Sequence, residues 1–218
     1  MKNKIVLLLL LASITLQAQT KSYNNETISW NHSWIVKSAP GQNIPNVLLI
    51  GDSHVERYYP VVTNLLKDKA AVSKITTSLS MGDPTFIPHL KGLLAANTFD
   101  YIFFNNGLHG VLFSPREYAA DISKVFKLLI KNNPAVTIVW ANTTARRVPN
   151  KLDIFDAYHA DVIERNKYVS AFCNKKGIMV LDFFGLTVND TTLFTKDGIH
   201  VNELGVAAQA KLIAEVVR

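Results

Sequence analysis

Residues 47–55 read Val-Leu-Leu-Ile-Gly-Asp-Ser-His-Val and constrain the fold more than any other part of the 218-residue chain. Four consecutive apolar residues are typical of a strand buried on both faces of a sheet, and the polar residues follow at its carboxyl end. Ligands bind at this end of the strands in open α/β sheets. Gly51 permits a sharp turn, and the helical spacing of residues 55–69 predicts that Ser53 lies at the start of a helix with an exposed hydroxyl.

Gly-Asp-Ser alone is also explained by helix capping, because Asp and Ser are both favoured at the N-cap. A second segment, Asp197-Gly198-Ile199-His200, favours catalysis. An Asp three residues before a His in a turn can fold its carboxylate onto the imidazole and leave the other ring nitrogen free. The two segments together supply a nucleophile, Ser53, a base, His200, and an orienting carboxylate, Asp197.

With both segments in this order, residues 47–218 resemble the SGNH (GDSL) hydrolase superfamily, whose first sequence block is Gly-Asp-Ser and whose last is Asp-x-x-His. The resemblance implies that Ser53 is the nucleophile, His200 the base and Asp197 its partner. It also implies a glycine in the second block whose backbone N–H donates to the oxyanion. Gly82 is the matching position, and the alternative is a glycine that only forms a turn before Pro84.

The third block departs from the usual Gly-x-Asn of this superfamily and reads Asn105-Asn106-Gly107-Leu108-His109. Alignment on Gly107 places His109 at the asparagine position, whereas alignment on the asparagines gives that role to Asn105. A subset of exported SGNH proteins carries Asn-x-Gly-Leu-His here, so the variation resembles a subfamily form. The implied oxyanion hole comprises the N–H groups of Ser53 and Gly82 and a side-chain N–H of Asn105 or His109, and one such donor stabilises a transition state by roughly 3 kcal/mol.

Polar residues next to these blocks and in the loop 141–147 are candidates for substrate contact. That loop follows a fourth predicted strand and contains two threonines and two arginines, although loops are commonly polar for other reasons. The candidates are Asp52, His54, Asn106, Thr143 and Arg147.

The N-terminal residues have the pattern of an export signal. Lys2 and Lys4 precede an apolar run, and Leu-Gln-Ala at 16–18 suits cleavage after Ala18. The apolar run is too short for a stable membrane anchor. We therefore expect a signal peptide over residues 1–18 and a periplasmic or secreted protein.

Residues 19–46 are polar and interrupted by prolines, with Trp30, His32 and Trp34 interleaved. This composition predicts an arm that packs its aromatic residues on the following domain and covers an edge of its sheet. Alternatively, Trp30 and Trp34 line a sugar-binding rim, because indole faces stack on pyranose rings.

Strands and helices alternate over residues 47–218, which predicts parallel pairing through right-handed crossovers. We expect one domain with a three-layer α/β/α sandwich of about five parallel strands, flavodoxin-like. The predicted strands are 47–50, 70–76, 101–104, 137–140 and 178–181, and the predicted helices are 55–69, 86–96, 115–132, 157–175 and one that begins near Asn202. Asp156 is expected to cap the fourth helix, and residues 183–196 are expected to form a loop.

The charge pattern favours no macromolecular partner. Removal of Lys2 and Lys4 with the signal peptide lowers the formal charge from +6 to +4, and the basic residues are scattered. Nucleic-acid binding would need a concentrated basic stripe. No metal or cofactor is expected, because the sequence has no cluster with zinc spacing and no glycine-rich dinucleotide motif. Its one cysteine, Cys173, is expected to be buried.

These observations predict a serine esterase that removes small acyl groups, such as acetyl, from carbohydrate. The acetyl and carbohydrate parts of this prediction follow from the resemblance to secreted SGNH esterases. Lysophospholipids or thioesters are alternative substrates. A sugar O-acyltransferase, or a non-catalytic glycan-binding protein on the same scaffold, is an alternative function.

Overall fold

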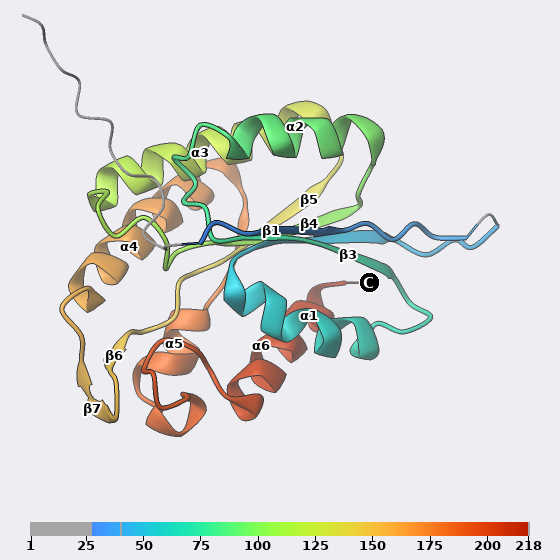
Figure 1. The fold of residues 1–218 in the computed structure, drawn as a ribbon. Coiled ribbons are helices and arrows are strands. Elements are labelled where there is room, and N and C mark those ends of the chain that lie inside the picture. Colours follow the sequence, from blue (N-terminus) through green and yellow to red (C-terminus); the bar gives the residue numbers. More distant parts are fainter. Residues whose placement is uncertain (1–27, 40, 218) are drawn as a thin grey trace, which may run out of the picture.

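The computed structural model of the chain describes residues 28–39 and 41–217 (Figure 1). The predicted signal peptide and the first part of the arm lie outside the described residues. Within the described ranges, no helix is both long enough and apolar enough to cross a membrane.

The central sheet has six strands in the order β1-β3-β2-β4-β5-β8. Their bounds are β1 (Asn31–Trp34), β2 (Asn46–Gly51), β3 (Ala71–Thr77), β4 (Tyr101–Asn105), β5 (Thr137–Ala141) and β8 (Met179–Leu181). Strands β2, β3, β4, β5 and β8 pair in parallel, which confirms the five predicted parallel strands. Strand β1 pairs with β3 antiparallel, so the arm covers one edge of the sheet as expected.

Helices cover both faces of the sheet, which confirms the three-layer α/β/α sandwich (Figure 1). One face carries α2 (Phe86–Ala96), α3 (Pro115–Asn132) and α4 (His159–Lys176), and the other carries α1 (Ser53–Leu65), α5 (Phe183–Val188) and α6 (Glu203–Val216). Alternate residues of β2 enter the two cores: Leu48 and Ile50 pack in one, Val47 and Leu49 in the other. The apolar run therefore forms a strand buried on both faces, as predicted.

The helix ends follow local sequence signals in most places. Ser114 and Glu117 form a reciprocal capping box at the start of α3, with Pro115 in the first turn. Gly177 ends α4 with a φ of 66°, and Asn202 caps α6. Cys173 is buried as expected.

Asp156 is not the N-cap of α4, as the sequence had indicated. The helix starts later, with Tyr158 at its N-cap. One oxygen of Asp156 accepts a 3.0 Å hydrogen bond from the Tyr158 backbone N–H, and the other pairs with Arg146 at 2.8 Å. The carboxylate therefore anchors the preceding loop.

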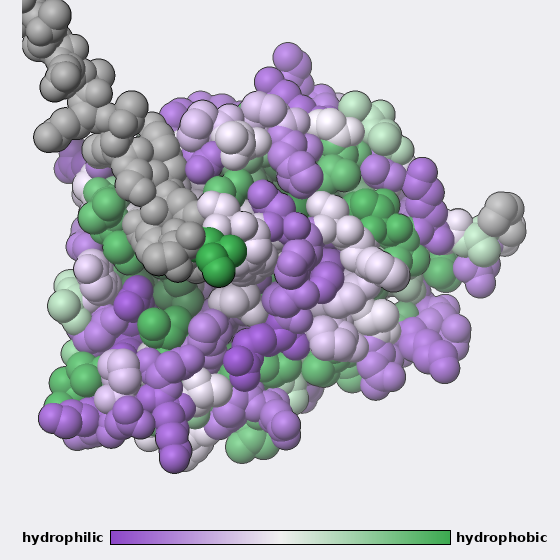
Figure 2. All heavy atoms as spheres, in the orientation of Figure 1, coloured by the Kyte–Doolittle hydropathy of each residue, from purple (hydrophilic) through white to green (hydrophobic). Residues whose placement is uncertain are grey.

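Two regions, residues 147–155 and 183–196, contain helices or strands that the sequence did not predict. Residues 147–155 form a hairpin of β6 (Arg147–Val148) and β7 (Lys151–Phe155), most of whose side chains are exposed, so no burial pattern marks it. Helix α5 and a 3₁₀ helix (Thr191–Leu193) occupy the predicted loop 183–196. Both helices are too short for a helical period to be visible in the sequence. Figure 2 shows that the described part of the face in view is mainly hydrophilic, with hydrophobic residues in small groups.

Candidate active site

The turn that follows β2 requires glycine at position 51. A Cβ atom on Gly51 would lie 1.7 Å from the backbone oxygen of Asn105 and 2.5 Å from the side chain of Val55. Asp52 then caps α1, because its Oδ1 accepts a 2.9 Å hydrogen bond from the His54 backbone N–H. Close packing of β2 against β4 therefore places Ser53 in the first turn of α1, at the carboxyl end of the sheet.

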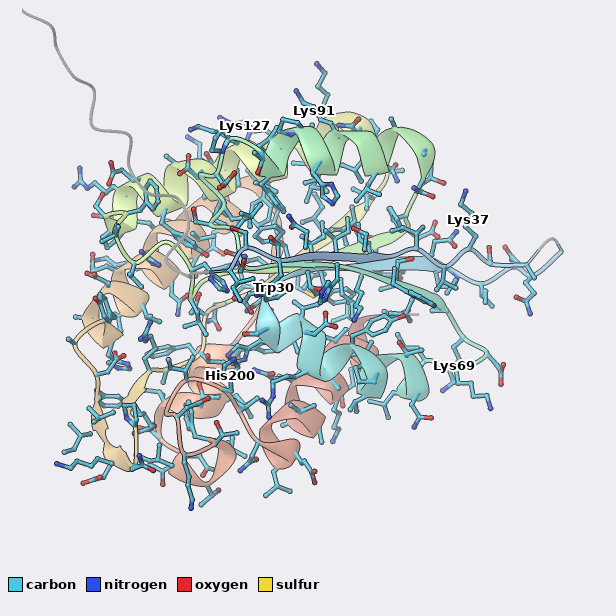
Figure 3. All side chains as sticks on the ribbon, in the orientation of Figure 1. Trp30, Lys37, Lys69, Lys91, Lys127 and His200 are labelled. Carbon is cyan, nitrogen blue, oxygen red and sulfur yellow. The ribbon has the colours of Figure 1, made fainter. Side chains whose placement is uncertain are left out.

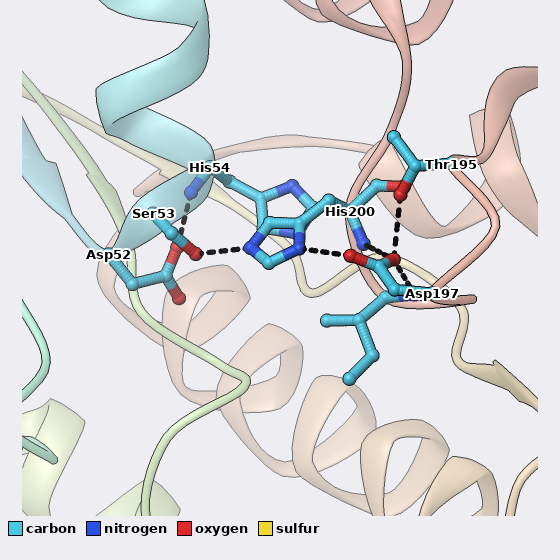
Figure 4. A network of polar contacts seen from close by, with 7 residues as sticks. Asp52, Ser53, His54, Thr195, Asp197 and His200 are labelled. Carbon is cyan, nitrogen blue, oxygen red and sulfur yellow. Dashed lines mark hydrogen bonds and ion pairs between the residues drawn. The ribbon is translucent and has the colours of Figure 1, made fainter. Parts of the chain in front are cut away.

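Ser53, His200 and Asp197 form a continuous hydrogen-bonded chain (Figure 4). Ser53 Oγ lies 2.8 Å from His200 Nε2, and His200 Nδ1 lies 2.7 Å from Asp197 Oδ2. Ser53 and His200 are 147 residues apart in the sequence, and the fold brings them together as predicted. With Nδ1 protonated toward the carboxylate, Nε2 is oriented to accept the proton of the serine hydroxyl.

The second oxygen of Asp197 is also fully engaged. Its Oδ1 accepts hydrogen bonds from the backbone N–H groups of Ile199 (2.8 Å) and His200 (2.9 Å) and from the Thr195 hydroxyl (2.7 Å). Burial on its own raises the pKa of Asp197, but these hydrogen bonds and the one from the His200 ring hold it well below its ordinary value. Asp197 is therefore ionised wherever His200 can act as a base.

Backbone contacts hold the loop that carries His200 and Asp197. Phe194 and Val201 form a β-bridge, and the Thr195 N–H donates to the His200 carbonyl at 2.8 Å. Gly198 has a φ of +72°, and a Cβ there would lie 2.3 Å from the Arg147 carbonyl oxygen. Since the Arg147 N–H also donates to the Gly198 carbonyl at 2.8 Å, the hairpin β6–β7 fixes this loop from the side.

His54 packs directly against the candidate base. The rings of His54 and His200 are stacked, with centroids 5.5 Å apart and an interplanar angle of 22°. His54 is 2% exposed. Neither of its ring nitrogens makes a well-formed hydrogen bond to the described residues. The nearby Ile199 backbone raises the pKa of the ring, but by less than burial lowers it. Burial lowers the pKa of His54 to about 4, more than the nearby Asp52 raises it. His54 is therefore an uncharged ring behind His200 at neutral pH.

The second and third sequence blocks lie against each other beside this site. Asn106 Nδ2 donates to the Leu79 carbonyl at 3.2 Å, and the Cα of Gly110 lies close to Ser80. Gly82 follows in a turn closed by a hydrogen bond from the Asp83 N–H to the Ser80 carbonyl. The proposed oxyanion donors of both blocks thus belong to one packed pair of loops.

Asn105 and His109 have different surroundings. Asn105 is buried, and its Nδ2 donates to the backbone oxygens of Ala141 (2.9 Å) and Asn142 (3.3 Å). These hydrogen bonds tie β4 to the end of β5. His109 is half-buried in the following loop. This difference favours His109 over Asn105 as a side-chain donor to substrate.

Arg165 holds the third block in place, a role that the sequence analysis missed. Its buried guanidinium donates to the backbone oxygens of Gly107 (3.2 Å), His109 (3.3 Å), Gly110 (2.7 Å) and Phe113 (2.9 Å). The available signal was an arginine on the face of the predicted helix 157–175 that also carries Val162 and Val169. An arginine on an inward face needs several acceptors, and loop carbonyls supply them here.

The five residues expected to contact substrate are all buried. Each of Asp52, His54, Asn106, Thr143 and Arg147 is at most 3% exposed. The Arg147 guanidinium donates to the Leu152 and Val188 carbonyls at 2.7 and 2.6 Å and lies over the ring of Phe155. The Thr143 N–H donates to Asn166 Oδ1 at 2.9 Å, and Asn166 Nδ2 donates to the Thr143 carbonyl at 2.8 Å. Burial argues against direct substrate contact for all five, and the contacts of Arg147 and Thr143 give these two residues structural roles.

The chain is similar in structure to several solved proteins. No family model and no curated protein sequence matches it. A GDSL-like lipase from Bacteroides thetaiotaomicron matches with a TM-score of 0.62 and 14% identity, over 83% of this chain and 91% of its own. An acetyl xylan esterase, AlAXEase, matches with a TM-score of 0.66 and 15% identity, over 79% of this chain and 100% of its own. A carbohydrate esterase family 3 protein from Talaromyces cellulolyticus matches with a TM-score of 0.66 and 14% identity, over 79% of this chain and 96% of its own.

These solved structures are similar to the chain in structure at low sequence identity, so the likeness concerns the fold alone. The chain therefore has the fold of the SGNH (GDSL) hydrolases.

Proposed function

We propose that this protein is a serine esterase of the SGNH type. The observation that carries the proposal is the chain of hydrogen bonds from the Ser53 hydroxyl through the His200 ring to the Asp197 carboxylate, at 2.8 and 2.7 Å. A serine in the first turn of a helix, with a base on its hydroxyl and a carboxylate behind the base, is the arrangement that activates a hydroxyl for attack on an acyl carbon.

In the proposed reaction, Ser53 Oγ bonds to the acyl carbon while His200 Nε2 takes the hydroxyl proton. The negative charge moves to the former carbonyl oxygen, where the N–H groups of Ser53 and Gly82 and the His109 side chain donate to it. Collapse of this intermediate breaks the bond to the alcohol oxygen, which leaves with the proton from His200. A water molecule then attacks the acyl-serine, His200 accepts its proton, and the acid departs as Ser53 recovers its proton. Asp197 holds the imidazole in the required tautomer and stabilises the imidazolium.

We further propose that the substrate is a carbohydrate ester with a small acyl group such as acetyl. Two solved structures with this fold are an acetyl xylan esterase and a carbohydrate esterase, which supports this substrate class by analogy. The N-terminal pattern of residues 1–18 supports export to the periplasm or the medium, where polysaccharides are accessible.

The test compares the mature chain with Ser53→Ala on p-nitrophenyl acetate, butyrate and octanoate. We expect Ser53→Ala to lower kcat/KM by at least about 10³-fold, because the nucleophile is lost, and to leave the unfolding temperature unchanged. A fluorophosphonate should label the wild type at Ser53. Ser123→Ala, a serine on α3 whose hydroxyl bonds the Ala120 carbonyl, is the matched control and should retain full activity.

Equal turnover by Ser53→Ala and the wild type would overturn the nucleophile assignment. Activity that falls steeply from acetate to octanoate supports an acetylesterase. Activity that rises with chain length would instead identify a lipid or thioester hydrolase.

A further inference from the structure

The two tryptophans of the arm, Trp30, which is half-buried, and Trp34, which is exposed, lie on the same face of the sheet as α1. Ser33 points to the opposite face, where its hydroxyl lies 3.3 Å from His89 of α2. His32 points to the α1 face, where its Nδ1 lies 3.7 Å from Glu56 of α1. Side chains alternate along a strand, so residues 30 and 34 share the face of His32. The ring centroids of Trp30 and His32 are 5.3 Å apart, which agrees with this placement.

Trp30 lies at the end of the sheet that carries the candidate active site. Its carbonyl accepts hydrogen bonds from the Ser78 N–H and the Thr77 hydroxyl, both at 3.1 Å, and its N–H donates to the Ser78 hydroxyl at 3.0 Å. Three hydrogen bonds therefore fix its backbone to the carboxyl end of β3. In Figure 3, Trp30 lies beside the start of α1, on the same side of the molecule as His200.

The strand register places Trp30 near the segment that carries the nucleophile. Thr76 of β3 pairs with His32 of β1 on one side and with Gly51 of β2 on the other, so these three residues are level along the sheet. Two inter-strand spacings, about 10 Å, therefore separate the backbones of His32 and Gly51. Trp30 precedes His32 by two residues and Ser53 follows Gly51 by two, both at the carboxyl end of the parallel strands.

Trp34 lies on the same face of the sheet as Trp30 but at the other end of β1. It pairs with Lys74, four residues before Ser78, which places it about 13 Å further from the carboxyl end of the sheet. Its side chain is 63% exposed. The arm thus carries two tryptophans on one face, one beside the candidate site and one remote from it.

We infer that Trp30 forms a stacking platform for a sugar ring of the substrate, next to the unit whose ester reaches Ser53. This inference rests on the proposed carbohydrate esterase function. An indole face offers a large apolar surface to the C–H groups of a pyranose ring, and a half-buried tryptophan with a fixed backbone loses little conformational freedom on binding. The platform also has a rigid support, because Glu56 behind His32 is bonded to Lys74 and to the Thr76 hydroxyl at 2.5 Å.

The test measures kcat and KM of Trp30→Ala with an acetylated xylo-oligosaccharide and with p-nitrophenyl acetate. We expect the KM for the oligosaccharide to rise about tenfold, with kcat nearly unchanged, because stacking binds the sugar but takes no part in the chemistry. The kcat/KM for p-nitrophenyl acetate, which has no sugar, should be unchanged. Trp30→Phe should restore part of the affinity for the oligosaccharide. The matched control Trp34→Ala should leave kcat and KM unchanged for both substrates.

A direct binding measurement covers the case in which Trp30→Ala fails to fold. In a Trp34→Phe background, the remaining tryptophans are Trp30 and the buried Trp140. Titration with the deacetylated oligosaccharide should change the fluorescence of this variant, and Trp30→Phe in the same background should remove the change.

Several outcomes would overturn the platform while the esterase assignment stands. One is a folded Trp30→Ala variant whose KM for the oligosaccharide is unchanged, or whose kcat/KM falls equally on both substrates. Another is a rise in the oligosaccharide KM in Trp34→Ala equal to that in Trp30→Ala. A third is the absence of a fluorescence change on titration. An enzyme that hydrolyses p-nitrophenyl acetate through Ser53 but neither binds nor hydrolyses the oligosaccharide also overturns it. Failure of the esterase assignment is distinct, because Ser53→Ala would then retain activity on p-nitrophenyl acetate.

Discussion

The loop that carries the base and the turn that carries the nucleophile are stabilised in different ways. In the loop, both carboxylate oxygens of Asp197 are hydrogen-bonded, and Oδ1 alone accepts three bonds. In the turn, Asp52 Oδ2 and both ring nitrogens of His54 are buried without a well-formed hydrogen bond to the described residues. The base is therefore positioned by polar contacts, whereas the nucleophile is positioned by the close packing around Gly51 and the His54 ring.

This difference indicates where each half of the site is sensitive. A preorganised carboxylate stabilises the imidazolium that forms during catalysis, so changes in the loop should affect the rate with little effect on the fold. Buried polar groups without partners cost stability, so changes in the turn should affect the stability of the protein, and in a pH-dependent way. Three substitutions separate these effects.

Asp197→Asn should have the largest effect. The amide keeps the shape of the side chain but removes the negative charge and favours the wrong tautomer of His200, so we expect kcat to fall by about 10³- to 10⁴-fold. Steady-state kinetics on p-nitrophenyl acetate measures this change, and the unfolding temperature should shift little.

Asp190→Asn is the matched control, because Asp190 makes the same type of contacts seven residues earlier. Its Oδ1 accepts from the Thr192 N–H at 2.9 Å and from the Thr192 hydroxyl at 2.6 Å. This variant should retain activity. A loss of activity equal to that of Asp197→Asn would show that the loop, and not the charge behind His200, limits the rate.

His54→Phe should alter stability in a direction that depends on pH. Burial lowers the pKa of His54 in the folded protein from 6.5 to about 4. Between these values the unfolded chain binds more protons than the folded one, so stability falls as pH decreases from 6.5 to 4. The shift corresponds to about 3 kcal/mol, which the wild type should lose over this range and His54→Phe should keep.

Urea unfolding of both proteins at pH 7.5 and pH 4.5 measures the difference. His54→Ala is the control, since it also lacks the titrating group but leaves a cavity behind His200. We expect His54→Phe to keep activity within a few-fold at pH 7.5 and His54→Ala to lose more. Equal losses of activity in the two variants would mean that the imidazole nitrogens, and not the ring surface, support His200.

The parts of the molecule that the sequence predicted are those set by local patterns. The apolar run of β2, the bounds of α3 and the four-residue turn from Asp197 to His200 each depend on neighbouring residues, and each was predicted correctly. Arg147 and Arg165 were not, because their roles depend on carbonyl groups that the fold brings from distant segments. A sequence shows that a polar residue is present but not which backbone atoms surround it.

Thr195→Val should have the smallest effect of the three and tests how much of the preorganisation lies in one contact. The substitution removes the 2.7 Å hydrogen bond to Asp197 Oδ1 and the 3.1 Å contact of the same hydroxyl with the His200 carbonyl. It leaves the two backbone donors to Asp197 and the His200 ring in place. A hydrogen bond to a charged group contributes about 1.5 to 3 kcal/mol, and the remaining donors should compensate in part, so we expect kcat to fall about tenfold. The matched control is Thr192→Val, which removes the equivalent hydroxyl bond to Asp190 and should leave kcat unchanged.

If Thr195→Val retained full activity, the three remaining donors would be sufficient to position Asp197. If its loss matched that of Asp197→Asn, the hydroxyl would control the placement of the whole loop, and the base half of the site would depend on packing as much as the nucleophile half does.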